Sequence, residues 1–265
     1  MTYKLYRDAL RDKARKLVDP QISMGPPYNP WLIAKILDVQ VQQEDLKGID
    51  GYVEVIDGNY RAVIGNSADV RMRFTLAHEL GHVVLMRSAA KGQSLALTRF
   101  RAPNLMETLH QDPEEEALCN DFAAELLMPF DQVKPLIQHT AHTPTAVWHI
   151  NRKFRVSIQA AATRIVDIEG RFRSAVSLWD RTTRWPMPIW WSGFKLAAPE
   201  MTKLESFVAN DWNPSFQLYS DMKMISVECK RVRNVALVVL TCGSHKLSGS
   251  KQERLKKNQQ LNLFE

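Results

Sequence analysis

Residues 73–86 of the chain read Arg73-Phe-Thr-Leu-Ala-His78-Glu79-Leu-Gly81-His82-Val-Val-Leu-Met86. His78 and His82 stand four residues apart, and Glu79 directly follows the first histidine. On a helix, positions i and i+4 share one face at roughly 5–6 Å, so both imidazoles can reach one metal ion. Glu79 lies about 100° further around the helix, where it can interact with a water molecule bound to that metal. The pattern predicts a metal-binding helix with hydrolytic chemistry.

Zinc suits this ligand set, because it binds histidine nitrogens and carboxylate oxygens. A structural zinc site closes with a fourth protein ligand. Two histidines and one carboxylate instead leave a position open for a water molecule, whose pKa the metal lowers to about 7. Glu79 is then predicted to accept a proton from this water as it attacks a peptide carbonyl polarised by the zinc.

The residues around the two histidines argue against a chance match on a surface helix. The stretch is apolar on nearly every side, which is typical of a buried helix. The apolar positions are Phe74, Leu76, Ala77, Leu80, Val83, Val84 and Leu85. Two histidines and a glutamate buried without partners would be costly. Gly81 costs roughly 1 kcal/mol of helix propensity relative to alanine, so it predicts a place where another backbone or a substrate approaches closely.

A second block, residues 111–129, is predicted to supply the third ligand. Asp112 is a good N-cap, Pro113 fits the first helical position, and Glu115 stands where it completes a capping box. Glu116 shares a helical face with Asn120 at the margin of the apolar stripe, so its carboxylate points at the core. This favours Glu116 over Glu115 as the metal ligand, and Asn120 is expected to hydrogen-bond a ligating side chain. The opposite, solvated face is predicted to hold Glu114, Asp121 and Glu125.

Together the two blocks resemble the ImmA/IrrE family of zinc metallopeptidases. The resemblance rests on His78-Glu-Leu-Gly-His82 and on Glu116-Ala-Leu-Cys-Asn-Asp-Phe-Ala-Ala-Glu-Leu-Leu-Met-Pro129, and it covers roughly residues 31–169. It implies that Glu116 is the third zinc ligand, and Cys119 stands where the family usually has alanine. It also implies a compact α+β metallopeptidase unit that cuts DNA-binding repressor proteins of mobile elements or stress regulons.

Composition is that of a soluble globular protein. The chain has 265 residues, 45% hydrophobic and 24% charged, enough for one full core and a smaller second domain. Its N-terminus lacks the pattern of a signal peptide, and its longest apolar run, residues 235–242, is too short to span a bilayer. Three scattered cysteines form no disulfide framework, so the cytoplasm is the expected location.

The net charge of +6 is concentrated at the C-terminus. Five Lys/Arg oppose two Glu in the last 20 residues, a balance of +3, which leaves about +3 for the rest of the chain. A folded body with so small an excess is a weak candidate for a DNA-binding face, so direct nucleic-acid binding is not expected.

Before the metal helix, the sequence predicts two helices and a hairpin. An amphipathic helix built on Leu5, Ala9, Ala14, Leu17 and Val18 is expected to end at Pro20, and a short one to cover residues 31–37. Strands at 51–56 and 60–64 flank a turn at 57–59, and Ser67 can cap the metal helix. The second strand is expected to lie beside the site, and the hairpin either covers the core or offers an edge that pairs with an extended peptide by β-augmentation.

After the second block, residues 131–169 contain three short helical patterns, with Ser157 as an N-cap. They are expected to finish the peptidase core, with a helix-turn-helix that contacts DNA as the alternative. Any of His110, His139, His142 and His149 could stabilise an oxyanion, although scattered histidines are ordinarily solvent-exposed.

Beyond residue 170 the sequence predicts a small, mostly β domain. Strand-like runs occur at 174–179, 188–192, 225–230 and 235–242. Five of the seven tryptophans lie in residues 179–212, where they are expected to fill a small core rather than to line a sensor site. The predicted domains are therefore 1–170, a metallopeptidase-like domain, 171–245, a β-rich domain, and 246–265, a tail.

The tail is predicted to be a flexible basic tether that ends in a docking peptide. Gln260-Leu261-Asn262-Leu263-Phe264 resembles the short peptide with which bacterial polymerases and repair proteins bind the DNA sliding clamp. In this interpretation Gln260 hydrogen-bonds while Leu263 and Phe264 fill a pocket. The alternative is that the tail packs on its own C-terminal domain or on a neighbouring molecule.

The sequence thus predicts a zinc endopeptidase with one Zn²⁺ per chain, whose substrate is a transcriptional repressor. The alternative is a regulatory binding module that sequesters a repressor or binds DNA without cutting. The intact glutamate at position 79 disfavours that alternative, because a scaffold that no longer catalyses hydrolysis does not need a general base.

Overall fold

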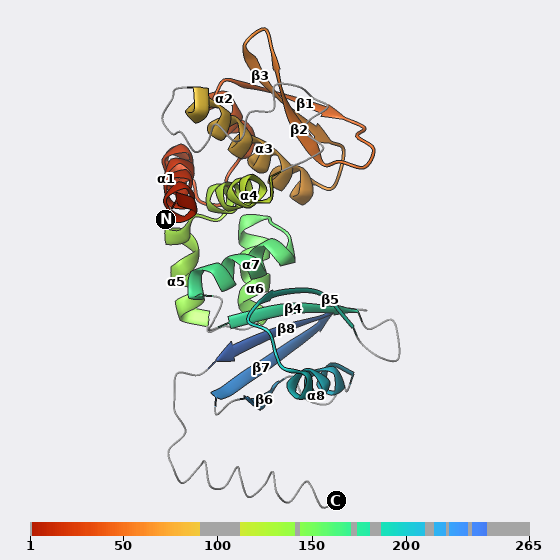
Figure 1. Cartoon of the computed structure of the whole chain (residues 1–265). Helices are drawn as coiled ribbons and strands as arrows, with labels where there is room; N and C mark the ends of the chain where they lie inside the picture. The colour runs from red at the N-terminus through yellow and green to blue at the C-terminus, as the bar shows by residue number, and fades with distance from the viewer. Residues whose placement is uncertain are drawn as a thin grey trace, which may run out of the picture. The chain divides into compact units, whose positions relative to one another are not determined.

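A computed structural model describes residues 2–90, 112–140, 144–170, 174–180, 187–209, 215–220, 223–232 and 235–242 (Figure 1). Within these ranges the chain forms helices α1–α8 and strands β1–β8, so the expected mixed α+β class is confirmed. It divides into two compact units. The N-terminal unit comprises Met1–Pro135 and His149–Ala160, and the C-terminal unit comprises Leu136–Trp148 and Ala161–Glu265. The predicted docking peptide at residues 260–264 lies outside the described residues and stays a prediction.

A three-stranded sheet forms one side of the N-terminal unit, in the order β1-β3-β2. Strands β2 (Gly51–Ile56) and β3 (Asn59–Gly65) form the predicted antiparallel hairpin. Asp57 and Gly58 both have positive φ, 50° and 78°, as expected for a tight two-residue turn. The sequence did not reveal β1 (Val39–Glu44), which pairs in parallel with β3. As a result β3 is the central strand of the sheet, and β2 is the strand of the hairpin that lies at its edge.

Helix α1 (Thr2–Ile22) is longer than predicted, because it continues through Pro20. The proline lies in the last turn, where it removes only one backbone hydrogen bond. The core face of α1 includes Ala14, Leu17 and Val18 as expected, but Leu10 takes the place predicted for Leu5 and Ala9, which are exposed. Helix α2 (Pro30–Ile36) follows, and the Asn29 side chain caps it by accepting from the Trp31 N–H.

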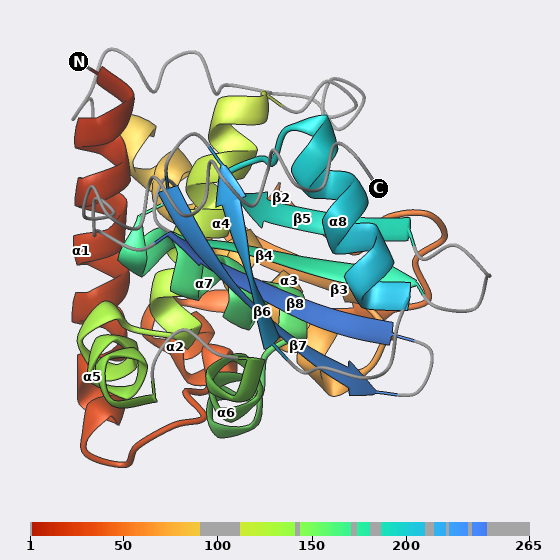
Figure 2. The same ribbon diagram turned by 90° about the horizontal axis from the view of Figure 1, so that it is seen from below.

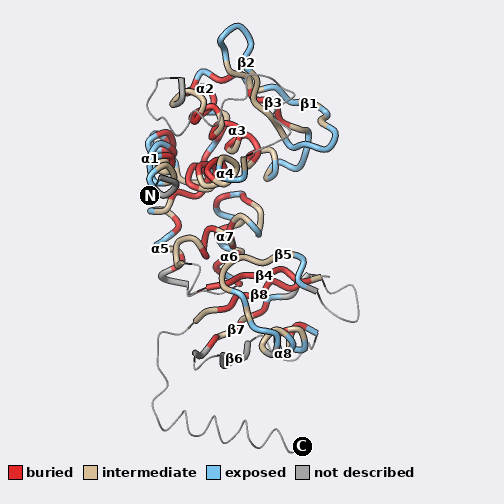
Figure 3. The backbone as a smooth tube through the Cα atoms, in the orientation of Figure 1, coloured by how far each residue is buried: buried red, intermediate tan, exposed pale blue. Residues whose placement is uncertain are grey.

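Helices α3 (Asp69–Ala90) and α4 (Pro113–Leu127) pack against each other in the interior of this unit. Every residue from 73 to 85 is buried or half-buried, so the predicted buried helix is confirmed (Figure 3). Helix α3 begins at Asp69, which moves its N-cap position to Ala68 and leaves Ser67 outside. Asp112 caps α4 as predicted, with its Oδ1 accepting from the Glu114 N–H at 2.8 Å.

Helix α1 covers the face of α4 that was predicted to be solvated. Arg7 and Arg11 of α1 pair with Asp121, and Arg15 Nε lies 2.7 Å from Glu125 Oε1. Glu125 is completely buried and also accepts from the Phe130 N–H. The predicted exposure of Asp121 and Glu125 is therefore wrong, because a distant arginine-bearing helix neutralises these carboxylates.

Arg73 joins three distant segments of the N-terminal unit. The residue is 5% exposed, and its guanidinium donates to the carbonyls of Tyr28, Phe154 and Arg155 at 2.8, 3.4 and 3.4 Å. Burial lowers the pKa of this guanidinium. The N-terminal part of α3 is thus fixed to the segment before α2 and to the end of the helix α6 (Pro144–Phe154).

Tyr28 provides a test of this packing. Its side chain is fully buried near Phe154, and its hydroxyl finds no hydrogen-bond partner among the described residues. Tyr28→Phe is expected to raise the free energy of unfolding by about 1 kcal/mol at neutral pH, because it removes an unsatisfied buried hydroxyl. The measurement is urea unfolding of both proteins.

The gain from Tyr28→Phe should grow in alkali. Burial raises the pKa of Tyr28, so above about pH 10 the hydroxyl ionises in the unfolded chain before it does in the folded one. Stability of the wild type therefore falls as pH rises through this window, and the phenylalanine variant lacks that contribution. A constant difference between the two proteins from neutral to alkaline pH would contradict the burial of this hydroxyl.

Helices α5 (Phe130–Thr140), α6 (Pro144–Phe154) and α7 (Ile158–Glu169) confirm the three helical patterns predicted between the second block and residue 170. Ser157 caps α7, with its Oγ accepting from the Ala160 N–H at 3.0 Å. Among the described residues, no helix is both long and apolar enough to cross a membrane.

The C-terminal unit contains a five-stranded antiparallel sheet in the order β5-β4-β8-β7-β6. Its strands are β4 (Ser174–Asp180), β5 (Met187–Gly193), β6 (Ser215–Ser220), β7 (Lys223–Val232) and β8 (Val235–Cys242). Four of them match the predicted runs, whereas β6 and the helix α8 (Ala198–Ala209) were not predicted. Leu204 and Val208 of α8 join the core beside the sheet (Figure 2), where Trp179 is fully buried as expected for a packing residue.

Candidate metal centre

The site is built where α3 and α4 come unusually close together. A side chain at Gly81 of α3 would place its Cβ only 3.1 Å from the Cys119 Cα of α4. The prediction that Gly81 marks a close backbone approach is therefore confirmed. This approach brings one face of α4, which carries Glu115, Glu116, Cys119 and Asn120, opposite the two histidines.

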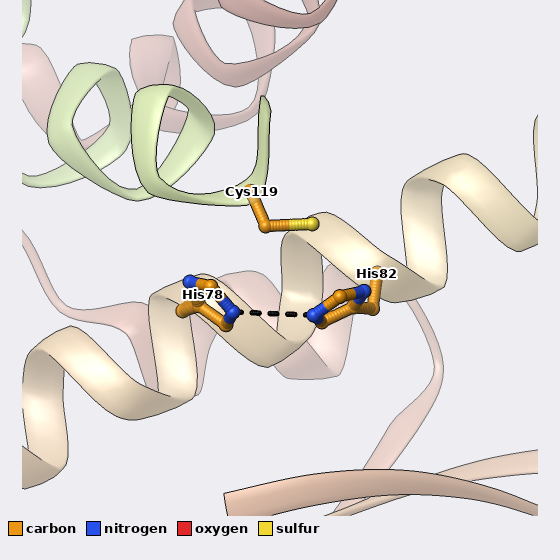
Figure 4. A group of neighbouring side chains, drawn as sticks. All are labelled: His78, His82 and Cys119. Atoms are coloured by element: carbon orange, nitrogen blue, oxygen red, sulfur yellow. Dashed lines mark hydrogen bonds between the residues drawn. The ribbon is translucent and has the colours of Figure 1, made fainter. Parts of the chain in front are cut away.

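Each histidine is oriented by a hydrogen bond at its Nδ1 atom. His78 Nδ1 lies 3.0 Å from Asn120 Oδ1, and His82 Nδ1 lies 2.7 Å from Glu115 Oε1. Because these oxygens accept a hydrogen bond from the Nδ1–H, each Nε2 keeps its lone pair when the imidazole is neutral. The two Nε2 atoms point at each other across 3.1 Å (Figure 4). The structure thus brings both predicted ligands into one site and gives Asn120 the hydrogen bond expected of it.

The Glu116 carboxylate lies against both Nε2 atoms. Its Oε2 is 3.2 Å from His78 Nε2, and its Oε1 is 3.3 Å from His82 Nε2. An imidazole that is also protonated at Nε2 can donate to this carboxylate, and such hydrogen bonds from His78 and His82 lower the pKa of Glu116 to about 2, so the carboxylate is charged. Nitrogen ligands of a tetrahedral zinc ion lie about 3.3 Å apart, given Zn–N bonds of about 2.0–2.1 Å. The two imidazoles and the carboxylate therefore fit a zinc ion in type, charge and spacing.

Glu115 has a role at this site that the sequence did not indicate. The predicted capping box is not the bond observed, because the Glu115 carboxylate reaches His82 instead. A carboxylate behind a ligating histidine fixes its tautomer and makes it a stronger ligand. Burial by itself lowers the pKa of His82, but hydrogen bonds to Cys119, Glu115 and Glu116 outweigh it and raise that pKa. The available clue was the pair of adjacent glutamates, Glu115 and Glu116, in the first turn of the helix that faces the two histidines.

Glu79 lies beside the sheet and is nearly buried, with 6% of its surface exposed. Burial raises its pKa above that of an ordinary glutamate, and the neighbouring histidines oppose this only in part. A Cβ at Gly51, the first residue of β2, would lie 3.1 Å from Glu79 Oε1 and 2.7 Å from Thr75 Cγ2. The missing side chain of Gly51 therefore leaves room for the Glu79 carboxylate at the edge strand, a contact that sequence reasoning missed.

Cys119 is a further potential ligand that was noticed only as a departure from the family pattern. One ligand atom from each of His78, His82 and Cys119 lies within 4.8 Å of the others. The thiol is completely buried, and burial raises its pKa to about 11.

Of the four histidines predicted as candidates to stabilise an oxyanion, the structure describes the side chain of one. His149 is exposed on α6, while His110, His142 and the side chain of His139 lie outside the described residues.

Residues 34–166 match the family model of the IrrE N-terminal-like domain. The chain belongs to the IrrE N-terminal-like domain family. The matched region contains both histidines, Glu79, Glu116 and Cys119, so the whole candidate centre lies in the IrrE-like region.

A curated relative is the radiation response metalloprotease IrrE of Deinococcus radiodurans, which is 30% identical over 132 residues. The alignment takes in 49% of this chain and 37% of that protein, so this chain spans little more than a third of the length of its relative. A transcriptional regulator of Mycobacterium tuberculosis superposes with a TM-score of 0.48 and 11% identity, over 91% of this chain and 81% of the other. This degree of likeness assigns no function to the chain.

Proposed function

We propose that this IrrE-like protein is a zinc-dependent endopeptidase in which His78, His82 and Glu116 hold the metal. The observation that supports this most is that the Nε2 atoms of His78 and His82 and the carboxylate of Glu116 lie within 3.1–3.3 Å of one another. At the same time the Nδ1 of each imidazole is hydrogen-bonded to a side-chain oxygen. A surface cluster without function has no need of such orientation on both rings.

When bound, zinc would supply a Lewis acid for the scissile carbonyl and lower the pKa of the attacking water. The chain's own residues would do the rest. Glu79 would accept a proton from this water and pass it to the leaving amine, and its burial, which raises its pKa, suits a group that must hold a proton between these steps. Asn120 and Glu115 would keep the two imidazoles in the tautomer that offers Nε2.

The substrate would be an extended segment of protein. Strand β2 is an edge strand of the sheet β1-β3-β2, and its first residue, Gly51, adjoins Glu79. An extended peptide added along β2 would receive main-chain hydrogen bonds and would be led towards this carboxylate. A transcriptional repressor is the proposed substrate class, as the family resemblance implies.

The test is metal analysis followed by a cleavage assay. The purified protein should contain zinc at near-unit stoichiometry and should cut a candidate transcriptional repressor, such as one encoded beside it, with the fragments identified by mass spectrometry. Chelation of the metal should stop cleavage and added zinc should restore it. A repressor complex that forms without cleavage at saturating zinc would instead identify a regulatory binding module.

A further inference from the structure

Cys119 is the one cluster residue at this centre that the proposed mechanism does not use. It follows Glu116 by three residues on α4, so both side chains lie on the same helical face. Figure 4 shows its side chain projecting from α4 over the two imidazoles of α3, with the sulfur towards His82.

The spacing of the cluster suits a shared metal ion. The Cys119 Sγ and one nitrogen of each histidine lie within 4.8 Å of one another. In a tetrahedral zinc site, with Zn–S bonds of about 2.3 Å, ligand sulfur and nitrogen atoms lie about 3.6 Å apart. The sulfur therefore needs a shift of about an ångström at most, which a χ1 rotation can provide. Thiolate is also a ligand that zinc binds well.

The ordinary interpretation is that Cys119 is a small apolar residue of the helix interface. Buried cysteines often have that role. Packing alone, however, does not explain why the sulfur points at the two imidazoles. The Nδ1 atoms of these imidazoles are already hydrogen-bonded to Asn120 and Glu115. Gly81 contributes here as well, because a Cβ at that position would meet the sulfur itself at 3.3 Å. The absent side chain lets the thiol reach the backbone turn between the two histidines.

We propose that Cys119 is a fourth protein ligand of the metal, beside His78, His82 and Glu116. This inference rests on the proposed zinc site. Four protein ligands close the coordination shell, as in structural zinc sites, whereas catalysis needs an open position. The resting protein is therefore latent, with its metal tightly held, and the sulfur must leave the metal before hydrolysis begins.

The test is the absorption spectrum of the cobalt-substituted full-length protein. Thiolate bound to Co²⁺ gives a near-ultraviolet charge-transfer band, which nitrogen and oxygen ligands do not give. We expect this band in the wild type and its loss in Cys119→Ala. The matched control is Cys229→Ala, a buried cysteine of β7 in the other unit, which should retain the band.

Two further readouts follow the same variants. Cys119→Ala should bind zinc at least about tenfold more weakly. Removal of a residue that only hydrogen-bonds a metal ligand already costs about that much affinity, and a direct ligand should cost no less. At saturating zinc its cleavage rate should exceed that of the wild type, because the open position is restored. Thermal unfolding of the metal-free proteins checks that the fold is intact, and Cys119→Ser serves if the alanine variant fails this check.

The outcomes separate the two proposals. Cobalt bound to the wild type without a thiolate band, or a band that survives in the position 119 variants, would overturn the role of Cys119 and leave the zinc peptidase standing. Failure of the wild type to bind either metal would instead remove the proposed function itself.

Discussion

Glu79→Gln is expected to reduce the rate of peptide hydrolysis by about 10²–10⁴-fold while zinc remains bound, since this is the usual contribution of a positioned general base. Glutamine has the same shape, so it fits the space that Gly51 leaves beside α3. It cannot take a proton from the attacking water. The measurement pairs the cleavage rate of the repressor substrate with the zinc content of the same preparation.

A matched control for this variant is Glu114→Gln. Glu114 is an exposed glutamate in the first turn of α4, on the same helix as the ligand Glu116 but away from the metal cluster. Its replacement should leave both zinc content and cleavage unchanged. Cleavage by Glu79→Gln at the wild-type rate would remove Glu79 from the mechanism.

His82→Ala is expected to lose both zinc and activity. This side chain carries the Nε2 that faces His78 and Glu116, and it also binds the Glu115 carboxylate through Nδ1. Alanine leaves Glu115 and Glu116 close together without the imidazole between them, so the site loses a ligand and gains carboxylate repulsion. Because a metal that binds only the folded state stabilises it, added zinc should raise the Tm of the wild type but not of this variant.

The corresponding control is His149→Ala, which removes an exposed histidine of α6. It should keep the zinc-dependent rise in Tm and the full cleavage rate. If His82→Ala retained a zinc-dependent rise in Tm of wild-type size, the metal would be held elsewhere in the chain.

The two helices of the site could be predicted because their determinants are local. The run from Phe74 to Leu85 is apolar on nearly every side, and Asp112-Pro113 is a strong helix start; both helices appear where expected. The spacing of His78 and His82 then fixes their relative placement, and the helical position of Glu116 directs its carboxylate towards them. The cluster geometry follows from these few positions.

The remaining features depend on contacts between distant segments. A capping box and a hydrogen bond to a ligating histidine require the same residue type at position 115, so only the facing helix distinguishes them. Glu125 looks solvated on its own helix and is buried only because Arg15 arrives from α1. Strand β1, Val-Gln-Val-Gln-Gln-Glu, has little apolar content and is specified by its parallel pairing with β3.

The three carbonyls that accept hydrogen bonds from Arg73 suggest an order in which this protein folds during its synthesis. A nascent chain that has emerged as far as Leu127 already carries both histidines, Glu79 and Glu116. It still lacks Phe154 and Arg155, which supply two of the three acceptors of the buried guanidinium. Burying that cation without them would be costly, so we expect the start of α3 to settle only after the end of α6 has left the ribosome. A chain assembled in this order would acquire its positioned metal helix only after most of its N-terminal unit has been made, so the proposed cleavage activity would not arise early in synthesis.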